Sequence, residues 1–444
     1  MSALELAAAI RRRELSAREA VDAALSRIAE SNGALNAFTG VFSERARARA
    51  AEIDTAFSAG RDPGTLAGVP FAAKDLFDVA GVVTRAGAKV TLADPPATRD
   101  ADAVVAFEAH GAILVGVTNM DEFAYGFVTE NEHTGATHNP HDLTRVAGGS
   151  SGGSAAAVGA DLVPLALGSD TNGSIRVPAA FCGIFGIRPT QRSLSTRGAY
   201  PFCNSLDTIG PFARTASDLQ AAYRALAGSI PESAPIAKPR VARLGGYFAT
   251  GLQPEANDAV DVVASALGAH TVVELSGARL AREAAFIITA CEAGELHAPR
   301  LRTQAADYDV ATRDRLLAGA LVPARWYIRA QRFRGVFRAQ ADALFADWDV
   351  LLAPATAYPA TPIGAKTIVI DGIESDIRPN VGVFTQPITL AGTPVVTVPI
   401  IKRGALPVGV QLIGRAGSEA MLLALARELE ASGTVGAGHV PVLV

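Results

Sequence analysis

The chain alternates between stretches with the apolar spacing of a helix and short runs that are apolar throughout. The stretches with helical spacing are 3–32, 43–60, 215–228, 254–268, 276–346 and 418–432. In the first stretch, an apolar face of leucine, alanine and isoleucine lies opposite three arginines at 11–13. The stretch 276–346 is predicted as a long helical tract rich in arginine and alanine.

The short apolar runs have the length and composition of buried strands. They occupy 66–79, 349–356, 394–400 and 409–414. Residues 101–119 combine both patterns, because a helical stretch ends at Gly111 and a strand follows it. Such alternation predicts an α/β fold with a mostly covered sheet.

We expect the 444 residues to form a single domain, since large α/β enzymes often reach this length undivided. Within that domain we distinguish N-terminal helices at 1–60, a core at 61–228, and a second lobe with closing strands at 229–444. The proline-containing segment 230–240 is the best candidate boundary. We interpret it as a loop between two lobes.

Composition favours a globular protein of the cytoplasm. Hydrophobic residues make up 49% of the chain and charged residues 19%, so a sizeable core can form. A net charge of −4 gives no general attraction to nucleic acid or anionic membranes. The 3 cysteines are widely spaced, which favours reduced thiols over disulfides or a zinc site. We expect neither a secretion signal nor a membrane span.

Two runs rich in glycine and serine, 148–154 and 168–174, lie on either side of an apolar segment. A surface loop would explain the composition, but the flanking sequences LVPLALG and IRVPAAFCGIFGI belong in a core. A phosphate-binding loop requires a lysine after the glycines, and neither run has one. Gly148, Ser150 and Gly152 match the nucleophile elbow of serine esterases, yet the polar residues before them are not the strand that this motif needs. We interpret the runs as turns that expose main-chain N–H groups.

The second run can stabilise a developing negative charge. Thr171, Asn172, Gly173 and Ser174 can direct several N–H donors at one point, with the Ser174 hydroxyl placed as a nucleophile. A serine hydroxyl needs a base, and neither run contains histidine or glutamate. Lys74 is the candidate, because it interrupts the apolar sequence GVPFAAKDLF and burial lowers the pKa of a lysine. The alternative is a lysine that extends from a strand edge into water.

Three segments together resemble the amidase signature family. They are PFAAKD around Lys74, GGSSGGSAAA at 148–157 and GSDTNGSIRVPAAFCG at 168–183. The resemblance continues through LAGVPF, GVTNMDEFAYG and PVGVQLIG, and so covers most of the chain. It implies the fold of that family, a large mixed twisted β-sheet covered on both faces by helices.

The resemblance also implies a Ser–cis-Ser–Lys triad. Ser174 corresponds to the acylated nucleophile, Ser150 to the bridging serine that follows a cis peptide bond, and Lys74 to the base. The N–H groups of residues 171–174 correspond to the oxyanion hole. The implied reaction is amide hydrolysis through an acyl-enzyme, with no cofactor and no metal.

A narrower resemblance lies within this family. Many members have Gly-Gly-Ser at the nucleophile, where this chain has Asn172-Gly173-Ser174. Residues 130–145, 168–190 and 199–215 resemble most the catalytic subunit of an enzyme of cyanuric acid (s-triazine) breakdown that releases ammonia from a carboxylated biuret. This implies a small carboxylated urea- or biuret-type substrate, dimerisation of the catalytic chain and a small helical partner subunit. The alternatives are the glutaminase subunit of a tRNA-dependent amidotransferase and a general aliphatic amidase.

A carboxylated substrate needs a cation in the pocket. The sequence RDRLLAG at 313–319 lies where glutamine-using members of the family place a substrate-binding arginine. Arg315 is the candidate and Arg313 the alternate, because a guanidinium binds a carboxylate through two hydrogen bonds. The alternative is that both arginines lie on the solvent-exposed face of a helix and bind no substrate. Tyr125 and Phe127 are candidate pocket walls, with core packing as the alternative.

The histidines offer an interpretation from another class, a metal-dependent hydrolase. His133, His138 and His141 fall close together, but no two have the i, i+4 spacing of a helical metal site, and Asn-Pro separates two of them. This interpretation is therefore not favoured.

Overall fold

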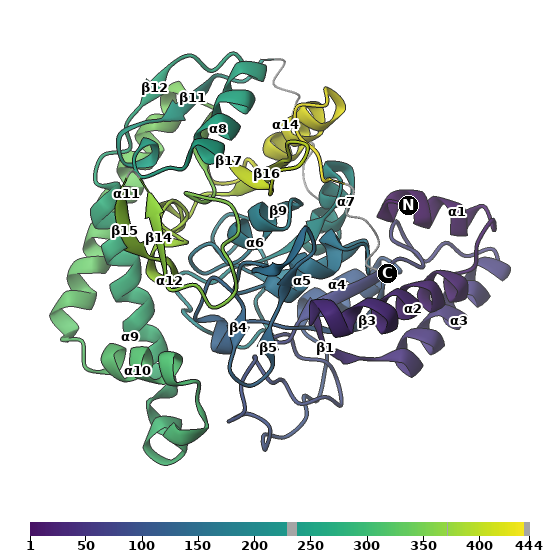
Figure 1. Ribbon diagram of the computed structural model, residues 1–444. Helices are drawn as coiled ribbons and strands as arrows, with labels where there is room; N and C mark the ends of the chain where they lie inside the picture. The colour runs from purple at the N-terminus through teal and green to yellow at the C-terminus, as the bar shows by residue number, and fades with distance from the viewer. Residues whose placement is uncertain (229–237, 371, 439–444) are drawn as a thin grey trace.

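A computed structural model describes residues 1–228, 238–370 and 372–438. Most of the loop predicted at 230–240 lies outside the described residues. The large sheet runs through the middle of the molecule, with α1 to α3 at one end and the long helices α9 and α11 at the other (Figure 1). The predicted α/β fold with a large mixed sheet is confirmed.

Within these described ranges, eleven strands form the large sheet, in the order β1-β3-β2-β8-β10-β9-β16-β17-β13-β11-β12. Their bounds are Phe38–Val41 (β1), Pro70–Lys74 (β2), Ile113–Thr118 (β3), Leu165–Ser169 (β8), Phe185–Arg188 (β9), Ile209–Ala213 (β10), Val241–Leu244 (β11), Val272–Val273 (β12), Val350–Pro354 (β13), Val395–Ile400 (β16) and Val408–Gly414 (β17). Strand β2 pairs in parallel with both β3 and β8, whereas β10, β9, β16 and β17 continue the sheet with antiparallel pairs. Three small two-stranded sheets are separate: Glu130–Asn131 (β4) with Gly135–Ala136 (β5), His138–Asn139 (β6) with Asp142–Val146 (β7), and Thr367–Ile370 (β14) with Ile373–Asp376 (β15).

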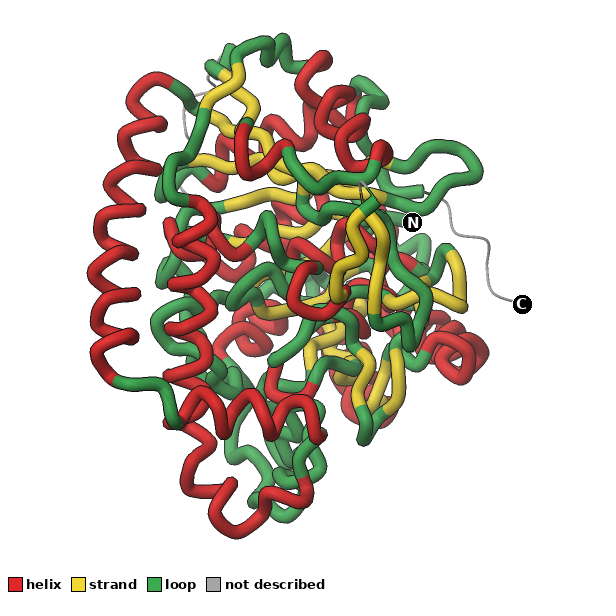
Figure 2. Tube along the Cα trace, turned by 60° about the vertical axis from the view of Figure 1, so that its left-hand side comes forward, coloured by secondary structure: helices red, strands yellow, loops and turns green. Residues whose placement is uncertain are grey.

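The helices follow the alternation that the sequence predicts. Their bounds are Ala3–Arg11 (α1), Ala17–Leu35 (α2), Ser43–Ser58 (α3), Asp102–Ala109 (α4), Gly152–Gly159 (α5), Arg176–Phe181 (α6), Ala216–Ala227 (α7), Pro254–Ala266 (α8), Ala278–Gln304 (α9), Val310–Ala320 (α10), Ala324–Asp347 (α11), Ile377–Asn380 (α12), Gln386–Ala391 (α13) and Glu419–Ala431 (α14). The tract predicted at 276–346 consists of α9, α10 and α11, of which the two long helices stand beside each other along one edge of the molecule (Figure 2).

Two predicted elements are shorter than expected. The helix predicted at 3–32 divides into α1 and α2, because Arg13 adopts a positive φ of 60° and Ser16 begins the next helix in a capping box with Glu19. The strand predicted at 66–79 extends only over β2. It ends because the carbonyl of Lys74 accepts the N–H groups of Leu76 and Phe77, which turns the chain away from the sheet.

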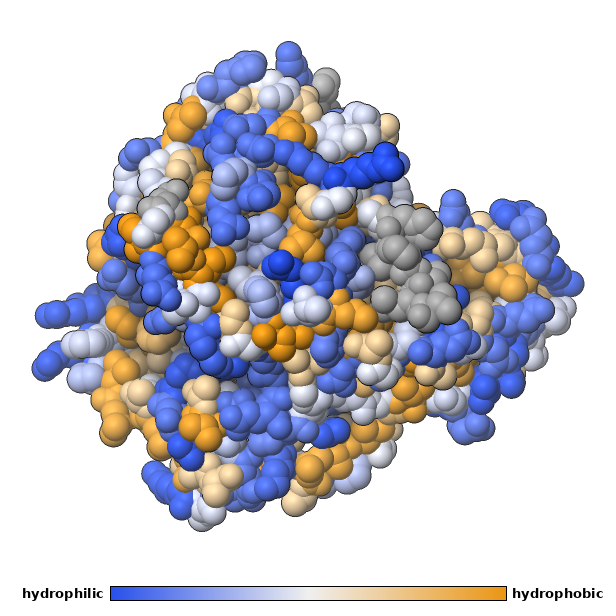
Figure 3. Space-filling model, in the orientation of Figure 1, coloured by the Kyte–Doolittle hydropathy of each residue, from blue (hydrophilic) through white to orange (hydrophobic). Residues whose placement is uncertain are grey.

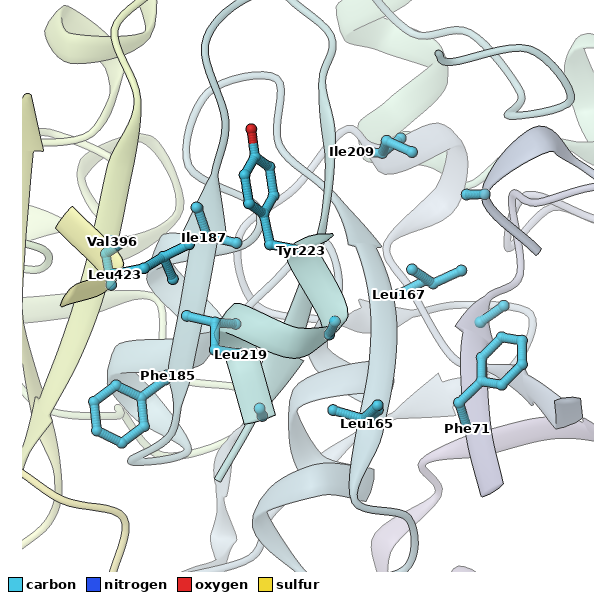
Figure 4. Close-up of a cluster of buried hydrophobic side chains, with 14 of the residues drawn as sticks. Phe71, Leu165, Leu167, Phe185, Ile187, Ile209, Leu219, Tyr223, Val396 and Leu423 are labelled. Carbon is cyan, nitrogen blue, oxygen red and sulfur yellow. The ribbon is translucent and has the colours of Figure 1, made fainter. Parts of the chain in front are cut away.

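The core on one face of the sheet lies beneath α7 and α14. Phe71, Leu165, Leu167, Phe185, Ile187 and Val396 of the strands gather there with Leu219, Tyr223 and Leu423 of these helices (Figure 4). The helices α5 and α6 pack on sheet strands as well, and Ala155, Ala156 and Ala157 of α5 and Ala179 of α6 belong to a different cluster of buried residues. Helices thus cover both faces, which fixes the ends of β2 and β8 inside the protein.

The surface carries no extended apolar belt on the face shown in Figure 3, where hydrophilic and hydrophobic side chains are interspersed. None of the helices within the described residues combines the length and apolarity that crossing a membrane requires.

Candidate active site

The ends of two parallel strands bring the first polar groups of the site together. Lys74 is the last residue of β2 and Ser169 the last of β8, and Ala73 lies opposite Leu167 in the pair. Because parallel strands end at the same edge, the two side chains meet there. The Nζ atom of Lys74 donates to Oγ of Ser169 at 2.9 Å and to Oγ of Ser150 at 2.6 Å.

Burial makes Lys74 a candidate base. The residue is 0% exposed, which excludes the alternative of a lysine that extends into water. Burial lowers the pKa of Lys74 to about 7, against smaller opposing contributions from the carboxylates of Asp121, Asp170 and Asp207. The neighbouring Asp75 accepts a hydrogen bond from the Thr39 hydroxyl at 3.0 Å, whereas Lys74 contacts the two serines.

Ser150 lies in the turn that precedes α5, and the Gly149–Ser150 peptide bond is cis. The side chain is buried, and the carbonyl of Ser150 accepts the N–H of Asp121 at 3.3 Å. A side chain at Gly149 would collide with the carboxylate of Asp121 and the main chain of Val128, so only glycine fits there. The glycines of the first run thus allow the close packing that holds the Ser150 hydroxyl against Lys74.

Ser174 lies in the turn between β8 and α6, and an ion pair shapes this turn. The carboxylate of Asp170 accepts the N–H of Gly173 at 2.8 Å and that of Ile175 at 3.2 Å, and it pairs with the guanidinium of Arg176 at 2.9 Å. Burial alone would raise the pKa of Asp170, but the charge of Arg176 and its hydrogen bonds lower it to about 2. Sequence reasoning missed this pair, although an arginine two residues after Ser174 was a visible signal.

The four N–H groups expected to form the oxyanion hole at residues 171–174 differ in their hydrogen bonding. The N–H of Gly173 is already donated to Asp170. The structure gives no intramolecular acceptor for the N–H groups of Thr171, Asn172 and Ser174 within the part of the chain that it describes. Gly173 has a φ of +134°, and a side chain there would collide with Thr385, so its contribution is conformational.

A cavity of about 800 Å³ opens in front of this turn. Thr171, Asn172 and Ser174 line it, as do Tyr125 and Phe127, which were expected as pocket walls. Sequence reasoning missed three further arginines that line the cavity: Arg279, Arg282 and Arg378. They come from α9 and α12, which lie far from the glycine-rich runs in sequence, so no local motif indicates them.

Of the two arginines that were candidates to bind a carboxylate, Arg315 and Arg313, the first lines the cavity and the second does not. Arg315 lines it, and its guanidinium lies 4.2 Å from the centre of the Tyr125 ring. Burial lowers the pKa of Arg315, with partial compensation from Tyr125 and Asp121. Arg313 donates instead to its neighbour Asp314 at 2.9 Å and is not among the lining residues.

The three histidines are not brought together. His133 contacts Glu122 at 3.0 Å, His138 contacts the carbonyl of Leu143, and His141 contacts the carbonyl of Cys182. The described residues contain no group of three or more histidine, cysteine or acidic side chains arranged to hold a metal ion.

The comparisons with known proteins agree with this geometry. A family model described as Amidase matches residues 19–423. The chain therefore belongs to the amidase family, as its sequence predicted, and it is an enzyme that hydrolyses amides. It is 46% identical over 451 aligned residues to AtzE, the 1-carboxybiuret hydrolase subunit of Pseudomonas sp. (strain ADP), with 98% of this chain and 99% of that protein covered. It is 36% identical to a glutamyl-tRNA(Gln) amidotransferase subunit of Azoarcus sp. (strain BH72), with 97% of each covered.

Solved structures show the same relationship. A chain of a vestigial protein complex, whose structure reveals the evolutionary origins of an s-triazine catabolic enzyme, superimposes with a TM-score of 0.96 at 46% identity, over 99% of this chain and 100% of that one. A crystal structure of an amidase superimposes with a TM-score of 0.90 at 33% identity, over 97% and 100% of the two chains.

Proposed function

We propose that this chain is the catalytic subunit of a 1-carboxybiuret hydrolase and releases ammonia from that substrate. The observation that carries this proposal is its 46% identity, over nearly the full length of both chains, to a subunit of such an enzyme. A buried lysine paired with Ser150, beside a cavity that contains Ser174 and arginine side chains, supports the chemistry.

The proposed reaction proceeds through an acyl-enzyme. Neutral Lys74 takes a proton from Ser174 by way of the Ser150 hydroxyl, and Oγ of Ser174 attacks the amide carbon. The N–H groups of Thr171, Asn172 and Ser174 hold the developing oxyanion, and one such donor typically contributes about 10²–10³-fold in rate. Ser150 then passes a proton to the leaving nitrogen, and water hydrolyses the acyl group.

Arg315 is the proposed partner of the substrate carboxylate. Replacing Arg315 with alanine is expected to raise KM for an anionic amide at least tenfold while kcat changes less, because the lost contact holds a part of the substrate that does not react. The matched control is Arg313→Ala, which removes an equal charge two residues away, outside the cavity. Steady-state kinetics on both variants test this, and an unchanged KM in Arg315→Ala would refute the role.

The substrate is tested by ammonia release from a panel. Among 1-carboxybiuret, allophanate, malonamate, glutamine and simple aliphatic amides, we expect the highest kcat/KM with 1-carboxybiuret. The panel is measured with the chain alone and with a co-expressed small partner. A clear preference for an aliphatic amide would exclude the proposed substrate.

We also propose that the catalytic chain dimerises and binds a small helical partner subunit. The similar structure of a vestigial protein complex supports association with a partner, and the dimer and the helical partner are proposed from the family resemblance. Light scattering, which measures the mass of the particle in solution, tests this on the chain alone and on the chain co-expressed with a small partner.

The second candidate is the glutaminase subunit of a tRNA-dependent amidotransferase. It is favoured by the 36% identity over 97% of the chain to such a subunit. The proposed triad suits both functions, so glutamine-dependent ammonia release in the panel is what separates them.

A further inference from the structure

The cavity in front of Ser174 contains a buried negative charge. Among the described residues, two acidic ones line it: Glu283 is exposed, whereas Asp121 is only 6% exposed. The other charged residues of the lining are arginines, which suit a carboxylated substrate. A buried carboxylate repels such a substrate, so the presence of Asp121 requires a separate explanation.

Asp121 is fixed beside Ser150. It directly precedes the short helical turn Glu122–Ala124, and its main-chain N–H donates to the carbonyl of Ser150 at 3.3 Å. Its carboxylate packs against Gly149, the residue before Ser150, where a side chain would collide with Oδ2. Since Ser150 is the residue proposed to pass a proton to the leaving nitrogen, Asp121 lies next to a group that this nitrogen must contact.

The two oxygens of the Asp121 carboxylate have different surroundings. Oδ2 accepts the main-chain N–H of Thr129 at 3.1 Å. Oδ1 accepts no hydrogen bond from the described residues, and protein atoms do not enclose it. It lies against Gly126, which also lines the cavity. Oδ1 is therefore the oxygen that a molecule in the cavity can reach.

Cationic side chains surround Asp121. Burial raises the pKa of Asp121, and three positively charged groups oppose this shift and favour the carboxylate: Arg378, Lys74 and Arg315. In return, Asp121 contributes most among the carboxylates that raise the pKa of Lys74 against the effect of burial. The carboxylate is thus within electrostatic range of the proposed base and of the proposed partner of the substrate carboxylate.

We propose that Oδ1 of Asp121 accepts an N–H of the leaving amide nitrogen, which makes Asp121 a further catalytic residue; this rests on the proposed function. The proton released by Ser174 reaches that nitrogen through Ser150, so the nitrogen becomes positively charged while it is still bonded to the tetrahedral carbon. The C–N bond then breaks, its electron pair stays on nitrogen, and neutral ammonia leaves as the carbonyl re-forms. A carboxylate that accepts an N–H stabilises the transient positive charge and itself gains no proton.

The test compares an amide with the methyl ester of the same acid. Malonamate and monomethyl malonate carry the same carboxylate and give the same malonyl-enzyme, but only the amide releases a nitrogen. In Asp121→Asn, the side-chain oxygen is expected to accept the N–H of Thr129, which leaves an NH₂ donor in place of Oδ1. The kcat/KM for malonamate should fall about tenfold or more, and that for the ester less than about twofold.

The ratio of the two values isolates the leaving group. Both are measured on one preparation and use the same base, so neither the folded fraction nor the pKa of Lys74 alters their ratio. Ammonia release from 1-carboxybiuret is measured alongside and should fall as it does with malonamate. If malonamate is not hydrolysed, the loss with 1-carboxybiuret is set against the loss with the ester.

The matched control is Asp75→Asn, a second buried aspartate that adjoins Lys74 and does not line the cavity. Its ratio of amide to ester hydrolysis should stay within about twofold of the unaltered enzyme. Asp121→Ala, which removes the acceptor without adding a donor, should show a smaller loss in the same direction. Equal losses on amide and ester, no loss, or the same selective loss in the control would overturn the role of Asp121. Hydrolysis of both substrates by Ser174→Ala would instead overturn the proposed function.

Discussion

Replacing Ser174 with alanine is expected to abolish ammonia release, with a loss on the order of 10⁴-fold or more in kcat. The Ser174 hydroxyl is the proposed nucleophile, and no second serine in the described chain is placed both in the cavity and in the turn held by Asp170. Alanine fills nearly the same space at this 3% exposed position, so the fold should survive. Ammonia release and the thermal unfolding midpoint are measured on the same preparation.

The matched control is Ser154→Ala. Ser154 is a buried serine of α5 whose hydroxyl contacts Thr118 at 2.7 Å and the Leu167 carbonyl at 2.9 Å. Its loss should cost about 1–3 kcal/mol of stability, as expected for a buried hydrogen bond, while the acyl-enzyme still forms. Normal turnover by Ser174→Ala would refute the assignment of the nucleophile.

Replacing Lys74 with methionine is expected to lower kcat on the order of 10³-fold or more, because the proton of Ser174 then has no base to receive it. In the unaltered enzyme, kcat/KM should rise with pH and level off above about 7, since only the neutral amine of Lys74 accepts a proton. The pH dependence of kcat/KM tests this. A rate that falls as pH rises from 6 to 8 would contradict a neutral lysine.

The same substitution has an expected effect on stability. Burial lowers the pKa of Lys74 from 10.5 to about 7. Below pH 7 the folded state therefore carries a buried charge, and between pH 7 and 10.5 it gives up a proton that the unfolded chain retains. This burden is largest below pH 7, on the order of 5 kcal/mol at 1.36 kcal/mol per pKa unit, and it vanishes as pH rises to 10.5. The unfolding free energy of the unaltered enzyme should therefore increase relative to Lys74→Met across pH 7–10.5.

Denaturant unfolding at several pH values measures this difference. The control is Lys89→Met, which removes a lysine whose side chain is 58% exposed and paired with Asp307. A constant difference between Lys74→Met and the unaltered enzyme over this range would show that Lys74 is not held neutral.

The triad was proposed through the resemblance of short segments to the amidase signature family. The residues alone indicated only turns that expose N–H groups, with Ser174 as a candidate nucleophile, and a lysine that interrupts an apolar strand. Ser169 was missed as a contact of Lys74, since only the parallel pairing of β2 with β8 brings the two residues together. The division of the first predicted helix was missed as well, because helical spacing continues across the capping signal at Ser16.

The substrate cavity was much less predictable. Arg315 was proposed from resemblance, and its stacking on Tyr125 gives that choice a physical basis over Arg313. No local sequence motif indicates that Arg282 and Arg378 line the cavity. Arg282 donates to the Pro379 carbonyl and to Asn380, so its place depends on how α9 packs beside α12.

The sequence by itself determined the α/β alternation, through side-chain periodicity, and the family, through the resemblance of short segments that also suggested the residues proposed for acyl transfer. Only the tertiary structure decided the burial that lowers the pKa of Lys74, which N–H groups near Ser174 have no acceptor among the described residues, and the cavity in front of Ser174. Each of these depends on what lies within a few ångströms after distant segments pack, since desolvation, ion pairing and enclosed space are properties of the packed neighbourhood.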